Sequence, residues 1–253
     1  MFNPFSLENK TVLITGASSG IGRQCAIDCS KMGAKVVLVA RNEERLNATL
    51  SMMEGDGHLV VAQDLTDFDV IPETVKQIIE KIGPLDGALH CAGISNTEPL
   101  KLYGVERLEE FFRANVFGAV MLTKEICKLK NYNKDGTSIV FFASVAAIVG
   151  ESCKSAYSMT KGALISSTRS LAVEYSKKKI RVNSVSPGVI ETPINANQNY
   201  MKDPVLREQF EAKHLLGLGQ TTDISNACIY LLSDASRWVT GQNLVVDGGY
   251  TVR

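Results

Sequence analysis

Residues 11–22 read TVLITGASSGIG, an apolar run followed by glycines at positions 16, 20 and 22. The run at 11–15 predicts a buried strand, and a helix is expected to open within the glycine turn. Glycines permit a tight turn and close approach of the backbone to phosphate, while a helix N-terminus presents free N–H groups. This place in the chain predicts a site for the pyrophosphate of a dinucleotide, with a ligand-free structural turn as the alternative.

Beyond this stretch, short apolar runs alternate with longer segments of helical periodicity. The pattern predicts an α/β fold, a Rossmann-type, doubly wound parallel sheet of about seven strands with helices on both faces. Strands are expected at 11–15, 35–40, 58–62, 86–91, 137–143, 180–186 and 243–246. Helices are expected at about 20–32, 42–53, 68–82, 105–130, 154–177, 203–213 and 221–233.

No linker or repeat interrupts this alternation, so we expect one dinucleotide-binding domain over residues 1–253. Its longest irregular stretch, 187–202, is rich in Asn and Gln and begins where ligands bind in open α/β sheets. We therefore expect a substrate loop at about 188–215 that closes over the ligand.

Composition excludes several classes of function. With 27 basic and 27 acidic residues the net charge is zero, so neither nucleic acid nor a membrane is expected as a partner. Six scattered cysteines without CxxC spacing indicate reduced thiols in a cytoplasmic protein. Cys25 and Cys29 lie four apart on a predicted helix, but no second ligand pair accompanies them, so no metal is expected.

The end of the second predicted strand, Ala40-Arg41, bears on the choice of coenzyme. An acidic residue there would bind the ribose hydroxyls of NAD and repel a 2′-phosphate, whereas a guanidinium suits phosphate geometry. NADP (NADPH) is therefore favoured, and NAD is the alternative. Asp64, after the third predicted strand, could pair with the adenine amino group or cap the next helix.

Tyr157 and Lys161 are one helical turn apart, so their side chains share a face of a predicted helix. A free tyrosine has a pKa of about 10 and transfers protons poorly at neutral pH. A nearby ammonium and an oxidised nicotinamide would both favour the phenolate, bringing Tyr157 toward useful acid–base strength. Ser144 ends the fifth predicted strand and could hold a carbonyl oxygen beside Tyr157.

Together these motifs resemble those of the short-chain dehydrogenases/reductases over nearly the whole chain. Residues 15–22 match TGxxxGxG, 157–161 match YxxxK, and Ser144 stands thirteen residues before the tyrosine. Further marks are Asn115, Pro187-Gly188 and the VDGG at 246–249. The resemblance implies four catalytic residues, Asn115, Ser144, Tyr157 and Lys161, with the lysine also binding the nicotinamide ribose and the asparagine anchoring a water.

The candidate cofactor-binding residues lie in the glycine turn, at the following strand ends and in the catalytic helix. They are Gly16, Ser18, Ser19, Gly20, Ile21, Gly22, Arg41, Asp64, Leu65, Ala92, Gly93, Tyr157, Lys161, Pro187, Gly188, Ile190 and Thr192. In the family, helices matching 105–130 and 154–177 pair across a two-fold axis. Together with the surplus of apolar positions on these helices, this implies a homodimer or homotetramer.

The chain departs from the family at His90-Cys91-Ala92-Gly93, where Asn-Asn-Ala-Gly is usual. The second asparagine normally ties strands together by hydrogen bonds, which Cys91 can do only weakly. We expect a softened rather than a lost site, with a packed, structural His90 and a small buried residue in Cys91.

The sequence thus predicts an oxidoreductase that moves a hydride between a nicotinamide cofactor and a carbonyl or secondary alcohol. A ketone, a 3-oxoacyl thioester and a sugar remain open as substrates. Enoyl reductases space the tyrosine and lysine more widely, and Leu164 here argues against them. Epimerases need a larger substrate domain. A non-catalytic dinucleotide sensor or scaffold is the alternative of another class.

Overall fold

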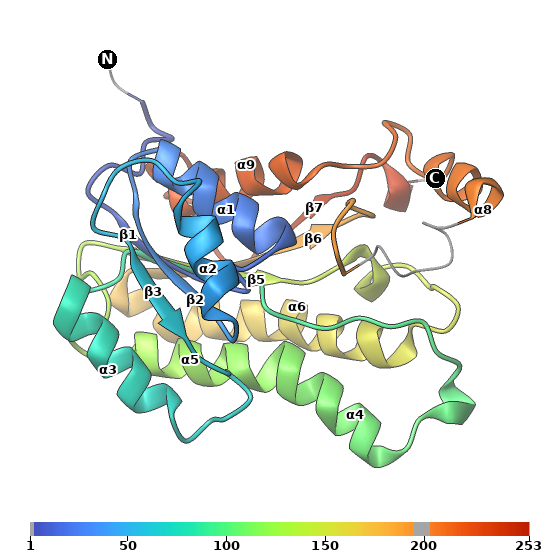
Figure 1. Cartoon of the computed structure of the whole chain (residues 1–253), viewed down its shortest axis with the longest axis horizontal. Coiled ribbons are helices and arrows are strands. Elements are labelled where there is room, and N and C mark those ends of the chain that lie inside the picture. Colours follow the sequence, from blue (N-terminus) through green and yellow to red (C-terminus); the bar gives the residue numbers. More distant parts are fainter. Residues whose placement is uncertain (1–2, 195–202, 253) are drawn as a thin grey trace.

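The computed structural model describes residues 3–194 and 203–252. Seven parallel strands form one sheet in the order β3-β2-β1-β4-β5-β6-β7 (Figure 1). They are β1 (Thr11–Thr15), β2 (Lys35–Ala40), β3 (Leu59–Ala62), β4 (Gly87–His90), β5 (Thr137–Phe142), β6 (Ile180–Pro187) and β7 (Asn243–Val246). The strand order reverses between β1 and β4, the position where doubly wound sheets bind ligands beyond their carboxyl ends.

Helices cover both faces of the sheet, which confirms the predicted fold class. Figure 1 shows α1 (Gly20–Lys31), α2 (Glu43–Leu50) and α9 (Thr221–Leu232) on one face. On the other lie α3 (Ile71–Ile82), α4 (Val105–Phe112), α5 (Gly118–Ile126) and α6 (Ser155–Tyr175). A further helix, α8 (Pro204–Glu211), lies near the C-terminus. None of the helices in the described ranges is long and apolar enough to cross a bilayer.

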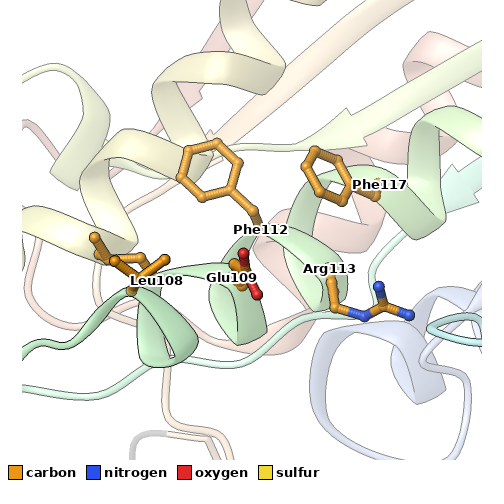
Figure 2. A pocket seen from close by; sticks show the side chains of 6 residues that line it. Leu108, Glu109, Phe112, Arg113 and Phe117 are labelled. Atoms are coloured by element: carbon orange, nitrogen blue, oxygen red, sulfur yellow. The ribbon is translucent and has the colours of Figure 1, made fainter.

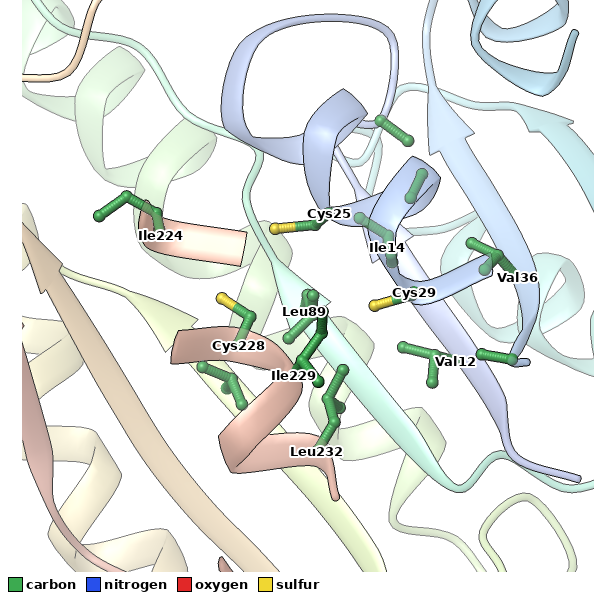
Figure 3. Close-up of a cluster of buried hydrophobic side chains, with 14 of the residues drawn as sticks. Val12, Ile14, Cys25, Cys29, Val36, Leu89, Ile224, Cys228, Ile229 and Leu232 are labelled. Atoms are coloured by element: carbon green, nitrogen blue, oxygen red, sulfur yellow. The ribbon is translucent and has the colours of Figure 1, made fainter. Parts of the chain in front are cut away.

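Strand side chains alternate between two buried layers, because successive residues of a strand point to opposite faces. In β1, Val12 and Ile14 join the cluster under α1 and α9, whereas Leu13 joins the cluster under α3, α5 and α6. Figure 3 shows the first cluster, with Cys25 and Cys228 facing one another between the two helices. Burial on both faces fixes the strands and thereby the positions of their carboxyl ends.

Several predicted boundaries were wrong in detail. The helix expected over 105–130 is interrupted by a π-helical turn at Arg113–Phe117, and α5 already ends at Ile126. A π turn adds a residue that apolar periodicity does not reveal, and such turns are frequent at functional sites. The helix expected from 68 begins at Ile71, because Pro72 suits the first helical turn. The strands expected at 58–62 and 86–91 are shorter, spanning Leu59–Ala62 and Gly87–His90.

The expected substrate loop is described only in part. Residues 195–202, including the polar Asn195, Asn197, Gln198 and Asn199, lie outside the described residues. Of the remainder, α8 confirms the helix predicted at 203–213 with slightly tighter bounds. Ile190 and Gly219 form an isolated parallel bridge that holds the two ends of this region together.

Candidate active site

The glycine turn after β1 is shaped for close contact with a ligand. Gly16 and Gly20 have φ angles of +66° and +54°, which favour glycine. A Cβ on Gly16 would lie 3.0 Å from the Ala92 nitrogen, and one on Gly22 would lie 2.4 Å from the Gly16 oxygen. Since α1 begins at Gly20, its first N–H groups have no acceptor within the helix. This cradle fits the pyrophosphate of a dinucleotide.

Neighbouring elements hold this turn in place. The Thr49 hydroxyl of α2 donates to the Ala17 carbonyl at 2.9 Å, and the Arg23 guanidinium of α1 donates to the Ser18 carbonyl at 2.6 Å. These bonds occupy backbone oxygens and leave the N–H groups at the start of α1 unused. Thr192, far along the chain, lies over the turn: its Cγ2 would be 3.5 Å from a Cβ on Gly20.

The other strand ends also carry backbone that approaches its neighbours closely. The Ala92 N–H donates to the Thr15 hydroxyl at 3.0 Å. A Cβ on Gly93 would lie 2.9 Å from Asn115 Oδ1, and one on Gly188 would lie 2.9 Å from the Asp247 Cα. The structure therefore brings the predicted 16–22, 92–93, 188–192 segments to one edge of the sheet. Leu65 also lies there, its carbonyl 2.8 Å from a Cβ position on Gly118.

Arg41 and Asp64 form an exposed ion pair after β2 and β3, with 3.9 Å between Nη1 and Oδ2. Asp64 Oδ1 accepts from the Thr66 N–H at 2.9 Å and from its hydroxyl at 2.8 Å. Burial opposes ionisation, but these two bonds and the Arg41 charge together lower the pKa of Asp64. Asp64 thus stabilises a turn. Its predicted alternative role as a helix cap was wrong, because α3 starts seven residues later, at Ile71.

Tyr157 and Lys161 lie in the first two turns of α6. The Lys161 Nζ donates to the Phe142 carbonyl at 2.7 Å and lies 5.6 Å from the Tyr157 ring centroid. Ser144 follows β5 and is a hydrogen-bonding neighbour of the Tyr157 side chain. The structure therefore brings the three residues together as the motif predicted, with Lys161 almost fully buried.

The protonation of this pair differs from the sequence-based expectation. Burial raises the pKa of Tyr157 to about 12; Ser144 acts in the opposite direction, and Glu151 adds to the rise. Burial also lowers the pKa of Lys161 to about 8. The expected lowering of the tyrosine pKa by the ammonium was wrong for the protein alone, because desolvation exceeds the other influences on the phenol. An additional positive charge nearby would act to lower that pKa.

Asn115 sits on the π-helical turn and is 1 % exposed. Its Oδ1 accepts from the Ile94 N–H at 2.7 Å, and its Nδ2 donates to the Ile94 carbonyl and the Thr160 hydroxyl, both at 3.0 Å. The side chain thus ties the segment after β4 to α6, one residue before Lys161.

His90 is a packed residue, as predicted. It is 2 % exposed, its ring stacks on Phe141 with 5.0 Å between centroids, and Nε2 bonds to the Thr123 hydroxyl at 2.9 Å. Burial lowers its pKa to about 3, so the ring is neutral. The Cys91 side chain packs against the cluster of Figure 3, and burial raises its pKa. Within the described ranges, no His, Cys, Asp or Glu cluster is arranged to hold a metal ion.

Two charged residues beside Tyr157 escaped the sequence analysis. Lys154 Nζ lies 5.7 Å from the Tyr157 ring centroid, and the charge of Glu151 contributes to the raised pKa of the phenol. The sequence spacing could have predicted the position of Lys154. It precedes the tyrosine by three residues at the start of α6, so both side chains fall on one side of the helix.

Comparison with known proteins decides the family. A family model described as enoyl-(acyl carrier protein) reductase matches residues 16–251. The chain is 34 % identical to a glucose 1-dehydrogenase of Gluconobacter oxydans, covering 96 % of this chain and 92 % of that protein. It belongs to the short-chain dehydrogenase/reductase family. The protein is thus a nicotinamide-dependent oxidoreductase that acts on a small molecule.

Further relatives extend over the whole chain. An L-rhamnose 1-dehydrogenase (NAD(P)(+)) of a Sphingomonas species is 34 % identical, covering 97 % of this chain and 98 % of that protein. A solved short-chain type dehydrogenase/reductase from Mycobacterium marinum superposes with a TM-score of 0.87 at 30 % identity, covering 99 % of this chain and 98 % of that one. A structure from Agrobacterium tumefaciens with bound NADP gives a TM-score of 0.89 at 27 % identity and covers all of both chains.

Proposed function

We propose that this short-chain dehydrogenase/reductase interconverts a secondary alcohol and its carbonyl compound, with Tyr157 as the proton donor and acceptor. The observation that carries the proposal is the contact of the half-buried Tyr157 with Ser144, one turn from the buried Lys161. A non-catalytic sensor would have no need of this arrangement. An enoyl reductase is disfavoured by the close spacing of Tyr157 and Lys161 on one helix.

Each residue has a distinct part in this mechanism. In the reducing direction the Ser144 hydroxyl donates a hydrogen bond to the substrate carbonyl oxygen, and Tyr157 gives its proton to that oxygen as the alcohol forms. Lys161 binds the nicotinamide ribose and adds a positive charge near the phenol. Asn115 positions the segment after β4 and the helix that carries Tyr157. The nicotinamide, when bound, supplies the hydride.

The cofactor site is assigned to the candidate residues of the sheet edge. The glycine turn would hold the pyrophosphate. The backbone would lie close to the nicotinamide half of the dinucleotide at Ala92, Gly93, Gly188, Ile190 and Thr192. Arg41 is exposed at the end of β2, which supports binding of a 2′-phosphate and hence a preference for NADPH. Asp64 competes for the same guanidinium at 3.9 Å, so we expect the preference to be moderate.

For the substrate we propose a hydroxylated compound of the sugar or polyol class. Two relatives that match almost the full chain carry the names of sugar dehydrogenases. The surroundings of Tyr157 also support a polar substrate over a long acyl chain. They include the polar residues Ser95, Asn96, Lys154 and Glu151.

We further propose a homo-oligomer built on the face formed by α4 and the π-helical turn that follows it. A groove of about 410 Å³ lies on this face, and its lining is mostly apolar: Val105, Leu108, Glu109, Phe112, Arg113 and Phe117. Figure 2 shows the side chains that line it. Val105 is 66 % and Phe117 is 44 % exposed, whereas Phe111 of the same helix is fully buried. A second copy would cover these side chains, and closed symmetry is the usual outcome for such a self-contact.

The decisive experiment is a coenzyme-linked assay of the purified protein. D-glucose, L-rhamnose, polyols, simple ketones and 3-oxoacyl thioesters are offered with each oxidised or reduced coenzyme, and absorbance of the reduced nicotinamide is followed. We expect turnover of a hydroxylated compound, faster with the phosphorylated coenzyme. Coenzyme binding without turnover of any compound would instead support the sensor alternative.

A further inference from the structure

Lys154 is an ammonium buried beside the reacting phenol. It is 6 % exposed and precedes α6 directly. Its Nζ donates to the Ser95 hydroxyl at 3.2 Å and to the Asn96 carbonyl at 2.9 Å, and lies 5.7 Å from the Tyr157 ring centroid. An ammonium has three N–H groups, so one remains beyond these two bonds.

The charge of Lys154 has no ion-pair partner among the described residues. Every ion pair in those ranges involves other side chains. Two nearby carboxylates are engaged elsewhere. Glu98, whose N–H donates to the Cys153 carbonyl, contacts Asn96 and Arg107, and Glu151 contacts the Tyr250 hydroxyl at 3.2 Å. Lys154 is therefore surrounded by neutral acceptors and the face of a ring. Burying a cation among such groups costs free energy unless an anion pairs with it.

The pKa of Lys154 also indicates that its charge lacks a compensating anion. Burial lowers the pKa of Lys154, and the charge of Glu151 only partly offsets that effect. Lys161, whose Nζ lies 5.6 Å from the centroid of the same ring, donates to the Phe142 carbonyl and has its part in the proposed mechanism. Lys154 has no part in that mechanism, although it lies as close to the ring.

We propose that Lys154 binds a carboxylate of the substrate, so that the protein acts on a hydroxy acid and its oxo acid. The proposal rests on the proposed function, since it places the carbinol of the same molecule at Tyr157 and Ser144. The acid group would take the remaining N–H of Lys154 and complete the buried charge. Ser95 and Asn96, bonded to the same nitrogen, position it.

The test compares acids with neutral partners that differ only by a CH₂OH in place of the carboxylate. The pairs are lactate and propane-1,2-diol, 3-hydroxybutanoate and butane-1,3-diol, and gluconate and glucitol. Binding to the NADP⁺-loaded enzyme is measured by calorimetry, and kcat/KM by coenzyme reduction. For at least one pair we expect the acid to bind about tenfold to a hundredfold more tightly, the range for a hydrogen bond to a charged group.

Variants separate this role from a structural brace. Lys154→Met should abolish the preference for the acid and leave binding of the neutral partner unchanged, while Lys154→Arg should restore part of the preference. Lys76→Met, on the exposed surface of α3, serves as the matched control. Equal weakening of acid and neutral partner in Lys154→Met, or no preference for any acid in the wild type, would overturn the proposal.

The outcome is distinguishable from failure of the proposed function. Lys154-dependent binding of an acid without coenzyme reduction would leave the carboxylate site standing and contradict the proposed chemistry. If the wild type and Lys154→Met turn over neutral polyols equally well and show no preference for an acid, the proposed chemistry stands and the carboxylate site is contradicted.

Discussion

The ammonium nitrogen of Lys161 lies 5.6 Å from the centre of the Tyr157 ring, one turn further along α6. Even so, the pKa of the phenol is raised to about 12, because burial outweighs its polar neighbours. The proton is therefore held firmly on Tyr157 in the protein alone, a suitable starting point for donation to an alkoxide. In the proposed mechanism, a positive charge brought by the cofactor would lower this pKa.

Removal of the Tyr157 hydroxyl should abolish most activity and spare the fold. We expect Tyr157→Phe to lower kcat by roughly a hundredfold to ten-thousandfold, the usual contribution of a positioned proton donor. Coenzyme affinity and thermal stability should change little. Tyr175→Phe, at the far end of α6, is the control for loss of a phenol. Retention of more than about a third of wild-type turnover in Tyr157→Phe would refute the mechanism.

Coenzyme preference should depend on the end of β2. We expect the wild type to prefer NADPH by about tenfold to a hundredfold in kcat/KM, from hydrogen bonds to a charged phosphate. Arg41→Ala and Ala40→Asp should each remove that preference, whereas Arg45→Ala, an exposed arginine of α2, should not. A wild-type enzyme that prefers NADH contradicts the prediction, whatever the variants do.

Gly93 is expected to tolerate no side chain. A Cβ there would lie 2.9 Å from Asn115 Oδ1 and 3.5 Å from Lys161 Nζ, and three hydrogen bonds prevent Asn115 from yielding. Gly93→Ala should lower coenzyme affinity and destabilise the fold by about 1–3 kcal/mol. Gly162→Ala, with open space at its Cβ, should be neutral or stabilising. Calorimetric unfolding and coenzyme titration of both variants check this; equal behaviour would disprove it.

Stability should fall with acidification because of His90. Its pKa is about 3 in the folded protein, against an ordinary 6.5, so its contribution is complete above pH 6.5 and is lost as the pH falls toward 3. Linkage predicts a loss of about 2 kcal/mol in unfolding free energy between about pH 7.5 and pH 5 from this residue. Urea titrations across that range should show a shallower slope for His90→Asn. An unchanged slope would show that the imidazole is not buried in its neutral form.

Self-association should require the groove on α4 and the π-helical turn. In sedimentation velocity at micromolar concentration we expect a wild-type oligomer, and dissociation on Phe117→Glu, because a charge would be buried in the contact. Leu129→Glu, which alters an exposed side chain just beyond α5, is the control and should leave the mass unchanged. A monomeric wild type would rule out the proposed oligomer.

Local pattern sufficed wherever the relevant residues are neighbours in the chain. The strands at 11–15 and 35–40, the glycine turn of 16–22 and the i, i+4 pair of Tyr157 and Lys161 were all predicted, because each depends on residues close together in the chain. The predicted helix bounds were wrong where the chain leaves the regular α-helical period, as in the π-helical turn that contains Asn115.

Only the tertiary structure decided which distant residues meet and what burial does to them. Lys154 bonds to Ser95 and Asn96 nearly sixty residues away, and Arg41 after β2 contacts Asp64 after the neighbouring strand β3. Sequence spacing could pair Lys161 with Tyr157, but it could not show that burial raises the phenol pKa in the protein alone. Desolvation is set by everything packed around a group, and that environment comes from segments brought together by the whole sheet.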